Sequence, residues 1–411
     1  MNQFKQFLYY CIVFAAPILL ATTYKNVANF VPLLFLLLLF ISWKEVSPGV
    51  TKQPLIIFFI IFISFIFLSG FWSYRQEEAI ERIIKIMLLL LPACILLGSG
   101  HPGRYMDTKY TWWCLVVSFL LSIALTGWQL GEDRLLKNLL TGRAGGEHVS
   151  AYLNPAVICL VILLWPLLAL LHSTDMKLHT RVLVTTLCVI ALVALVFYGN
   201  SDTAWVAGIL GATAYVLIRF GLSPGIFKPF IVASIIIAVV ASPVVYDRLP
   251  VKNYKIDSDN FLVQQLAQSS YLHRIEIWDR CIELIAERPL LGWGMAASLN
   301  LPKLNEPSKI QYGQKRTDFM YPHNVFIQCL LEYGAIGLAL FLLWLNALIN
   351  WISKTPAPLR AYYSAAFITT VTVYSFGFPM WRSWWIVFLA VIPVIFMAAN
   401  RQHEAKPALG N

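Results

Sequence analysis

Charge is the scarcest feature of this chain. Only 13% of its residues are Asp, Glu, Lys or Arg, whereas 59% are hydrophobic. A protein with so few charged side chains cannot cover its surface with groups that water solvates well, so this composition excludes an ordinary soluble enzyme. Polar interruptions are also few, and apolar runs long enough to cross a hydrocarbon core of about 30 Å recur along nearly the whole length.

Several chemical signatures are absent as well. The seven cysteines lie almost all inside apolar runs and form no Cys-x-x-Cys pair, so we expect neither a disulfide framework nor a metal site. There is no nucleotide-binding glycine loop, no His-Glu-x-x-His and no Gly-x-Ser-x-Gly, and we expect no cofactor. A donor used outside the cytoplasm should then be linked to a lipid. The first apolar stretch lacks a small-residue cleavage site, which argues against a cleavable signal peptide.

What the chain does have is apolar sequence of helical length. Backbone polar groups find no water inside a bilayer, and the runs do not alternate as barrel strands would, so the spans should be α-helices. We predict an all-α integral membrane protein with about 12 transmembrane helices, at 7–23, 27–43, 54–72, 83–99, 111–130, 151–171, 182–199, 202–220, 227–245, 323–351, 359–380 and 383–399.

These spans divide the chain into three parts. Residues 1–245 hold spans 1–9, residues 246–322 form a large hydrophilic loop, and residues 323–411 hold spans 10–12 and a short tail. Lys and Arg are concentrated in the short connections on the side of the amino terminus, which places both termini in the cytoplasm and the loop on the far side. The net charge of +10 suits anionic lipid and an anionic substrate, and does not by itself indicate nucleic acid.

The stretch from Tyr321 to Asn324 is a polar cluster directly before a long apolar run. Pro322 suits a helix start, which would place His323 and Asn324 in the first turn, where backbone N–H groups attract anions. The positive end of the helix dipole disfavours imidazolium, so we expect a neutral, basic His323. Such an imidazole suits chemistry with a phosphate leaving group. The alternative is an interfacial histidine that only caps a transmembrane helix.

Within the hydrophilic loop, the segment 270–287 is predicted to be an amphipathic helix that lies on or near the membrane surface. It carries Arg274, which is either a functional residue or an arginine that faces solvent or lipid headgroups. Pro289, Gly292 and Gly294 should end the helix. The apolar residues at helical spacing on its predicted buried side are Ile275, Trp278, Ile282 and Ile285.

Further polar candidates lie at the predicted outer helix ends. Arg82 is a candidate phosphate ligand, because a charge at membrane depth needs a partner or a cavity, whereas its neighbour Lys85 can reach the surface by snorkelling. Arg143 and His148 belong to a glycine-containing segment that is either a substrate contact or a plain connector. Asp202 either acts on a substrate or caps the eighth span.

Four motifs follow one another late in the chain. They are Arg274-x-x-x-Trp278, Pro289-Leu-Leu-Gly-x-Gly294, His323-Asn-x-Phe326 and Glu332-x-Gly-x-x-Gly337. With the twelve spans and one dominant late outer loop, this order resembles the O-antigen ligase and polymerase superfamily, and within it most closely the lipopolysaccharide O-antigen ligases. The motif match runs from about 270 to 340, and the topology match covers nearly the whole chain.

The resemblance implies a glycosyltransferase of the bacterial inner membrane. Such an enzyme transfers polysaccharide from undecaprenyl diphosphate to a sugar hydroxyl of lipid A–core on the periplasmic face. Arginines can stabilise the leaving group without a metal, and direct attack in one step should invert the anomeric centre, so we expect a metal-independent, inverting transfer. It implies catalytic roles for His323 and Arg274 and substrate contacts for Asn324 and Trp278. Its implied partners are the lipid-linked O-antigen, lipid A–core, membrane lipids and the O-antigen polymerase machinery.

One position departs from the family pattern. A second functional arginine of ligases would fall within 200–205, where this chain has Asp202. An acidic side chain cannot hold a diphosphate, so we expect Arg143, Arg82 or Arg382, ranked in this order, to supply the second positive charge. Asp202 would then hold that arginine in place or cap its helix.

Three other activities remain open. An O-antigen polymerase uses the same donor to join repeat units, and a protein O-oligosaccharyltransferase has another acceptor. A transporter or flippase of lipid-linked oligosaccharides is the alternative from a different class. A transporter should show internal repeats and charges that meet at mid-membrane, whereas here the charges cluster at outer helix ends and in one outer loop.

Overall fold

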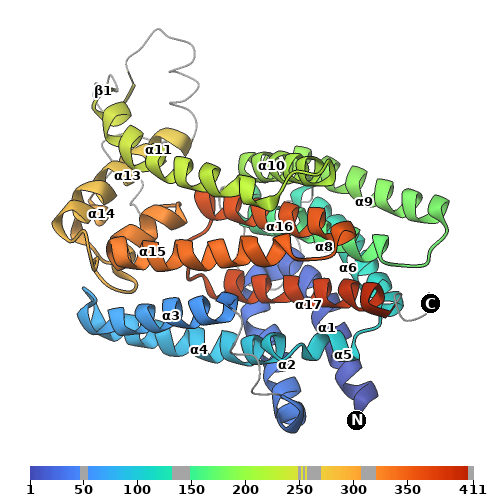
Figure 1. The fold of residues 1–411 in the computed structure, drawn as a ribbon. Coiled ribbons are helices and arrows are strands. Elements are labelled where there is room, and N and C mark those ends of the chain that lie inside the picture. The colour runs from blue at the N-terminus through green and yellow to red at the C-terminus, as the bar shows by residue number, and fades with distance from the viewer. Residues whose placement is uncertain are drawn as a thin grey trace.

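A computed structural model of the chain describes residues 1–46, 54–131, 149–248, 251–252, 255–256, 270–306 and 321–405. These residues form a bundle of long helices (Figure 1). The helices of the first half are α1 (Asn2–Thr23), η1 (Tyr24–Asn26), α2 (Val27–Ser42), η2 (Trp43–Glu45), α3 (Pro54–Ser69), η4 (Gly70–Trp72), α4 (Gln76–Gly98), α5 (His101–Tyr105), α6 (Thr108–Gly131) and α8 (Val149–His172).

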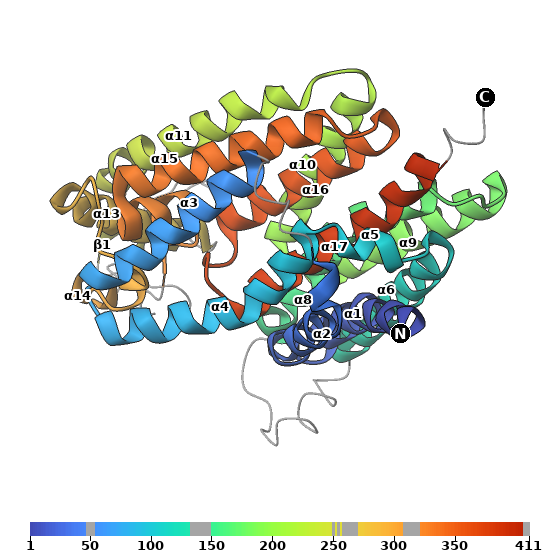
Figure 2. The same cartoon turned by 60° about the horizontal axis from the view of Figure 1, so that its bottom comes forward.

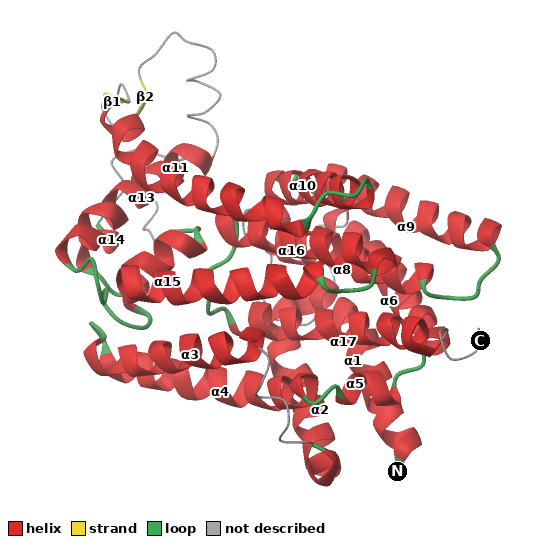
Figure 3. Cartoon of the chain, in the orientation of Figure 1, coloured by secondary structure: helices red, strands yellow, loops and turns green. Residues whose placement is uncertain are grey.

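The second half continues the bundle and adds the polar region at one end. Its elements are α9 (Leu178–Tyr198), α10 (Asp202–Arg219), η5 (Pro224–Ile226), α11 (Phe227–Asp247), β1 (Val251–Lys252), β2 (Lys255–Ile256), α13 (Ser270–Glu287), η6 (Ala297–Leu299), α14 (Pro302–Asn305), α15 (Val325–Ser353), α16 (Ala357–Phe376) and α17 (Ser383–Ala405). The two short strands pair antiparallel, and helices and loops make up the rest of the described chain (Figure 3).

The all-α membrane class is confirmed, and each of the twelve predicted ranges falls on a helix. Eight segments of the described residues are long and apolar enough to cross a membrane, and the first of them, Asn2–Glu45, contains both α1 and α2. The predicted spans on α4, α10 and α16 form helices that are not among these eight. The chain is therefore a multi-pass helical protein, and twelve spans remain a prediction.

The helices differ in how far they are enclosed. In the most apolar stretches of α8 and α17, 83% and 72% of residues are buried, against 22% in those of α3, α9 and α11. α8 packs against α6, α16 and α17, and α10 packs along α16. α8 and α17 are thus the interior of the bundle, and the outer helices present apolar faces of the kind that suit lipid.

Two ends of the bundle are distinct. α13 and α14 gather at one end, whereas the amino end of α1 and the carboxyl end of α17 lie away from them (Figures 1 and 2). This arrangement agrees with termini on one side and the polar loop on the other. The side of the membrane that each end faces remains a prediction.

A buried polar cluster, which the sequence did not indicate, joins three elements of the first 105 residues. Lys5 is fully buried and forms an ion pair with Glu45, which also accepts a hydrogen bond from the hydroxyl of Tyr105 at 2.6 Å. The ring of His101 lies 2.7 Å from the Tyr9 hydroxyl oxygen through Nδ1, and burial lowers the pKa of His101 to about 4. The cluster joins α1, η2 and α5 through neutral and paired groups.

The helix α13 confirms the predicted range but not the predicted face. Its fully buried apolar residues are Ile277, Cys281 and Leu284, which pack with Ile327 and Leu331 of α15. The predicted set of Ile275, Trp278, Ile282 and Ile285 is only half-buried.

The physical reason lies in two charged residues on the true inner face of α13. Glu276 and Arg280 are buried there and pair at 2.8 Å, one turn apart. Arg280 also donates to the main-chain carbonyls of Lys303 at 3.1 Å and Glu306 at 2.9 Å. The charges satisfy one another inside the fold, so α13 packs against α11 and α15 instead of only resting on a membrane surface.

Candidate active site

The helix α15 is broken where the sequence predicted continuity. Gly334 has φ 64° and ψ −167° in the middle of the apolar run, so α15 consists of a short segment before this residue and a longer segment after it. A helix break leaves backbone groups without helical partners, and these must be satisfied from elsewhere. Here the partners come from residues 288–296, which we call the strap.

The strap follows α13 and bonds along both sides of the break. The amide of Ala335 donates to the carbonyl of Pro289 at 2.8 Å, and the amide of Gly294 donates to the carbonyl of Glu332 at 2.7 Å. Two further bonds run from Ile336 to Leu290 and from Trp293 to Leu331. The Pro-Leu-Leu-Gly-x-Gly and Glu-x-Gly-x-x-Gly motifs therefore form one backbone-to-backbone junction.

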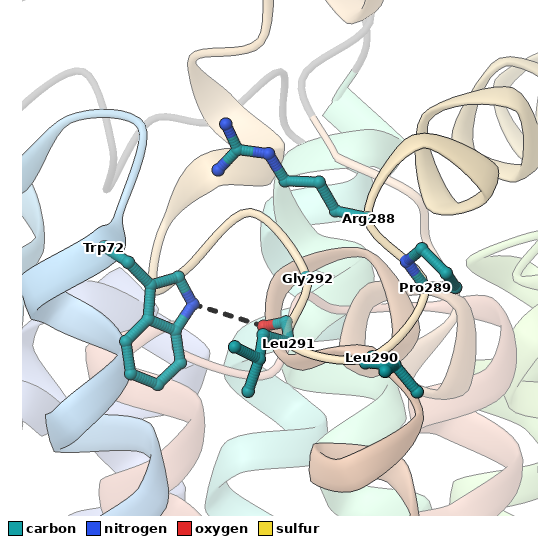
Figure 4. A pocket seen from close by; sticks show the side chains of 6 residues that line it. All are labelled: Trp72, Arg288, Pro289, Leu290, Leu291 and Gly292. Carbon is teal, nitrogen blue, oxygen red and sulfur yellow. Dashed lines mark hydrogen bonds between the residues drawn. The ribbon is translucent and has the colours of Figure 1, made fainter.

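The other edge of the strap is bonded to the last residue of α3, Ser69, whose hydroxyl accepts from the amide of Met295, and to the residues that follow η4. The Ser73 hydroxyl donates to the carbonyl of Met295 at 2.7 Å, and the Tyr74 amide donates to that of Trp293 at 3.0 Å. The Trp72 indole donates to the carbonyl of Leu291 beside an open apolar hollow of about 350 Å³ (Figure 4). The strap thus fixes α13 to both α3 and α15, and with it the position of Arg274.

Replacing Gly334 by alanine is expected to destabilise this junction. The residue has a positive φ, and an added Cβ would collide with the main chain of Leu290. We expect a loss of roughly 2–4 kcal/mol, measured as a lower unfolding temperature of the purified protein in detergent. Gly208→Ala in α10 is the matched control, because its Cβ meets only a Val161 methyl at 3.5 Å. Equal stability of the two variants would contradict the account.

His323 lies just before α15 and not in its first turn. The helix begins at Val325, and Asn324 is its N-cap, with a side-chain oxygen that accepts from the amides of Phe326 at 3.0 Å and Ile327 at 3.2 Å. The prediction of an anion site at these amides is wrong, because the Asn324 carboxamide already occupies them. Asn324 therefore shapes the site through the backbone, and a substrate contact by it remains a prediction.

The backbone and ring of His323 are both fixed. Its φ is 54°, a left-handed conformation that non-glycine residues rarely adopt and that tends to occur at functional sites. The ring Nδ1 lies 2.9 Å from the carbonyl oxygen of Gly377. A carbonyl can only accept, so Nδ1 carries the hydrogen and a neutral ring has its lone pair on Nε2. This is the tautomer required of a base that acts through Nε2.

Tyr321 packs on the imidazole of His323, and two arginines act on Tyr321. The Tyr321 ring lies 4.1 Å from that of His323, and the Arg382 guanidinium lies 5.5 Å from the Tyr321 ring. Burial raises the pKa of Tyr321 above its ordinary value, and the positive charges of Arg382 and Arg274 oppose that rise. Two guanidinium groups on different elements therefore act on one side chain that contacts His323. This concentration of positive charge suits a bound anion.

Trp278 connects α13 to this cluster. Its indole N–H donates to the carbonyl of Pro322 at 2.6 Å, so α13 is bonded to the residue that precedes His323. Arg274 is half-buried and lies one turn earlier on the same helix. The structure thus brings together four predicted residues, His323, Arg274, Trp278 and Arg382.

The other predicted residues lie elsewhere or outside the described chain. Arg82 is half-buried on α4, and within the described residues no hydrogen bond or ion pair joins it to the His323 cluster. Asp202 is exposed at the first position of α10, whose cap is Ser201, so the prediction that Asp202 caps this helix is wrong. Arg143 and His148 lie outside the described residues.

Sequence reasoning missed Tyr321 as a contact and Gly377 as the acceptor for His323. The position of Tyr321, two residues before His323, could have identified it as a contact of the imidazole. Gly377 has no side chain, so the sequence held no signal for its role. As for metals, no group of three or more His, Cys, Asp or Glu that could hold an ion occurs in the parts of the chain that the structure describes. Metal independence stays a prediction.

Comparison with known proteins gives similar proteins that are all described as polysaccharide or O-antigen ligases. A protein of Rickettsia conorii that is provisionally named a polysaccharide ligase is 30% identical over 330 residues, which is 79% of this chain and 75% of that protein. Proteins of Rickettsia felis and Rickettsia typhi with the same kind of name are each 24% identical, over about 80% of this chain and 76% of their own length. A family model described as O-antigen ligase matches residues 187–342, which include Arg274, Trp278 and His323.

Proposed function

We propose that this chain, which belongs to the O-antigen ligase family, transfers polysaccharide from undecaprenyl diphosphate to a sugar hydroxyl of lipid A–core. The observation that carries the proposal is the bond from His323 Nδ1 to the carbonyl of Gly377, beside two arginines that act on the same neighbouring tyrosine. This arrangement would supply a base of defined tautomer, His323, next to the positive charges that would bind the diphosphate.

The reaction follows from these groups. His323 Nε2 takes the proton of the acceptor hydroxyl as its oxygen forms a bond to the anomeric carbon of the donor sugar. The bond from that carbon to the diphosphate oxygen breaks, and undecaprenyl diphosphate leaves with the electron pair. Arg274 and Arg382 stabilise the negative charge that develops on the leaving group. Attack in a single step from the opposite face inverts the anomeric centre.

The proposal includes a position in the cell. With twelve spans, a cytoplasmic amino terminus and the loop 246–322 between spans 9 and 10, the His323 site opens to the periplasm of the bacterial inner membrane. Both substrates are lipid-linked, so each can reach the site from within the bilayer. Support comes from the two distinct ends of the bundle, with α13 at one and the termini at the other.

Deletion of the gene, followed by electrophoresis of lipopolysaccharide, tests the proposal. A ligase deletion leaves lipid A–core without polymer, and restoring the gene returns the polymer. A core that carries a single repeat unit would instead identify an O-antigen polymerase, which uses the same donor. An unchanged pattern would reject both. Deletion of a flippase would also leave core without polymer, because the donor would stay on the cytoplasmic side. An assay of the purified protein with supplied donor distinguishes the two, since only a ligase transfers the polysaccharide.

Arg382 is expected to be the second positive charge of the site, ahead of Arg82. Arg382→Ala should weaken donor binding and lower transfer by roughly 10²-fold, because it removes a charge that faces the leaving group. Arg82→Ala is the matched control, since it removes an arginine from α4 without touching the His323 cluster. Binding of the donor and the transfer rate are measured separately. A larger loss in Arg82→Ala would reverse the assignment, and Arg143→Ala, measured in parallel, tests the order predicted from sequence.

A further inference from the structure

The short segment of α15 before Gly334 carries two buried polar side chains one turn apart. Gln328 is 3% exposed and Glu332 is fully buried, in a helix whose neighbours are largely apolar. Burying an amide and a carboxyl costs free energy unless each is hydrogen-bonded. Their partners therefore indicate what these two residues do.

Gln328 connects two elements with both ends of its amide. Its Oε1 accepts from the main-chain amide of Met380 at 2.9 Å, and its Nε2 donates to Oε1 of Glu332 at 3.1 Å. Glu332 Oε1 also accepts from the Ser298 hydroxyl at 2.5 Å. An amide N–H can only donate and a carboxylate can only accept, so Glu332 fixes which end of Gln328 faces Met380.

Met380 lies in the connection between α16 and α17, residues 377–382, which we call the α16–α17 loop. This loop begins with Gly377, which accepts from His323, and ends with Arg382 beside Tyr321. α15 itself starts one residue after Asn324, directly behind His323. Gln328 therefore joins the helix that follows the base to the loop that orients the base.

The network is not what a purely stabilising contact requires. Among the described residues, no donor reaches the buried Oε2 of Glu332 with good geometry, since the nearby Tyr333 hydroxyl donates to the sulfur of Met295, and this is costly for a carboxyl group. An apolar side chain of similar size would fill the same volume without that cost. The buried carboxyl of Glu332 therefore costs stability, and its Oε1 sets the orientation of the Gln328 amide.

We propose that Gln328 and Glu332 are positioning residues that hold the α16–α17 loop, and so place the Gly377 carbonyl and Arg382 against His323 and the diphosphate. This inference rests on the proposed function, and it extends the site by about two helical turns into the bundle. Neither side chain touches the substrate. Both act through the loop.

The test compares Gln328→Met with Thr369→Val in the full-length purified protein. Methionine matches the volume of glutamine and removes the acceptor for Met380. Thr369→Val also removes a buried interhelical bond, from the Trp165 indole at 2.8 Å, but on α16 away from the loop. We expect Gln328→Met to lower kcat by about 10- to 100-fold, because small displacements of catalytic groups have effects of that size. Thr369→Val should retain activity at a similar unfolding temperature.

Two further measurements separate positioning from folding. Hydrogen exchange of the Met380 amide should become at least about tenfold faster in Gln328→Met and stay unchanged in Thr369→Val. Gln328→Glu should be impaired because it sets two carboxyls side by side, and the double variant Gln328→Glu with Glu332→Gln should recover activity, since it restores one acceptor and one donor.

The outcomes are distinct. Normal kcat and normal Met380 exchange in Gln328→Met would overturn the inference while leaving the transferase proposal intact. Impairment of kcat with a matching fall in unfolding temperature, and no recovery in the double variant, would also overturn it. A wild-type protein that transfers no polysaccharide would reject the proposed function, whatever the exchange of Met380.

Discussion

His323→Ala is expected to leave a folded, membrane-inserted protein that transfers roughly 10²–10⁴-fold less polysaccharide to lipid A–core, the usual effect of removing a positioned base. The Nδ1–H of His323 is bonded to Gly377, so the lone pair that accepts the proton is on Nε2. The imidazole of His323 also packs against the ring of Tyr321 at 4.1 Å, which holds it beside Arg382. The measurement is the rate of transfer by purified protein from lipid-linked donor to lipid A–core.

The backbone of His323 supplies a control for folding. Its φ of 54° suits glycine better than alanine, so His323→Gly should fold at least as well as His323→Ala while it also loses the base. His179→Ala removes an exposed histidine at the start of α9 and should retain full activity. Near-normal transfer by His323→Gly would mean that the base lies elsewhere and that His323 only shapes the turn before α15.

The sequence was enough to identify His323 as a candidate, because a polar cluster directly before a long apolar run can be recognised from the residues alone. The long apolar runs were also enough to place twelve helices, and the helical spacing of apolar residues was enough to place α13. They could not show that α15 breaks at Gly334, because hydropathy continues unchanged across this residue. The break is stable only because the backbone of Pro289 and Leu290 supplies partners, and those residues lie 45 and 44 positions earlier in the chain than Gly334.

Two other errors share one physical origin. The buried face of α13 was predicted from its apolar residues alone, yet Glu276 and Arg280 are buried because they pair with each other, and Arg280 also donates to main-chain carbonyls. From sequence, Arg143 ranked first for its flanking glycines and Arg82 second for its depth in a span, and nothing in the sequence near Arg382 raised it above them. Tertiary packing of the α16–α17 loop brings it to Tyr321. The residue type shows which chemistry a side chain can perform, but the sequence does not show which distant residues become its partners in the folded protein.

Arg274 is the residue for which geometry, and not only charge, is expected to matter. It lies one turn before Trp278, whose indole is bonded to Pro322, and its charge acts on Tyr321 beside His323. A guanidinium presents several N–H donors in a planar fork that matches two phosphate oxygens, whereas an ammonium is a compact point charge on a flexible stem. Arg274→Ala should therefore lower transfer by roughly 10²–10³-fold, the range found when one donor to a developing negative charge is lost.

Arg274→Lys is the decisive variant. It keeps the positive charge and most of the side-chain length, so an electrostatic role at a membrane surface predicts nearly full activity. A diphosphate held by the fork predicts a loss close to that of Arg274→Ala. Arg248→Ala, which removes an exposed arginine just after α11, controls for the change in net charge near this end of the bundle.

Two measurements make the comparison specific. Donor affinity and the transfer rate at saturating donor are determined for each variant, because a contact that strengthens as the leaving group gains charge lowers kcat more than it raises KM. We expect that pattern for both Arg274 variants and no change in Arg248→Ala. Full activity of Arg274→Lys would show that Arg274 contributes charge alone. The recognition of the diphosphate would then rest on Arg382 and the oriented imidazole of His323.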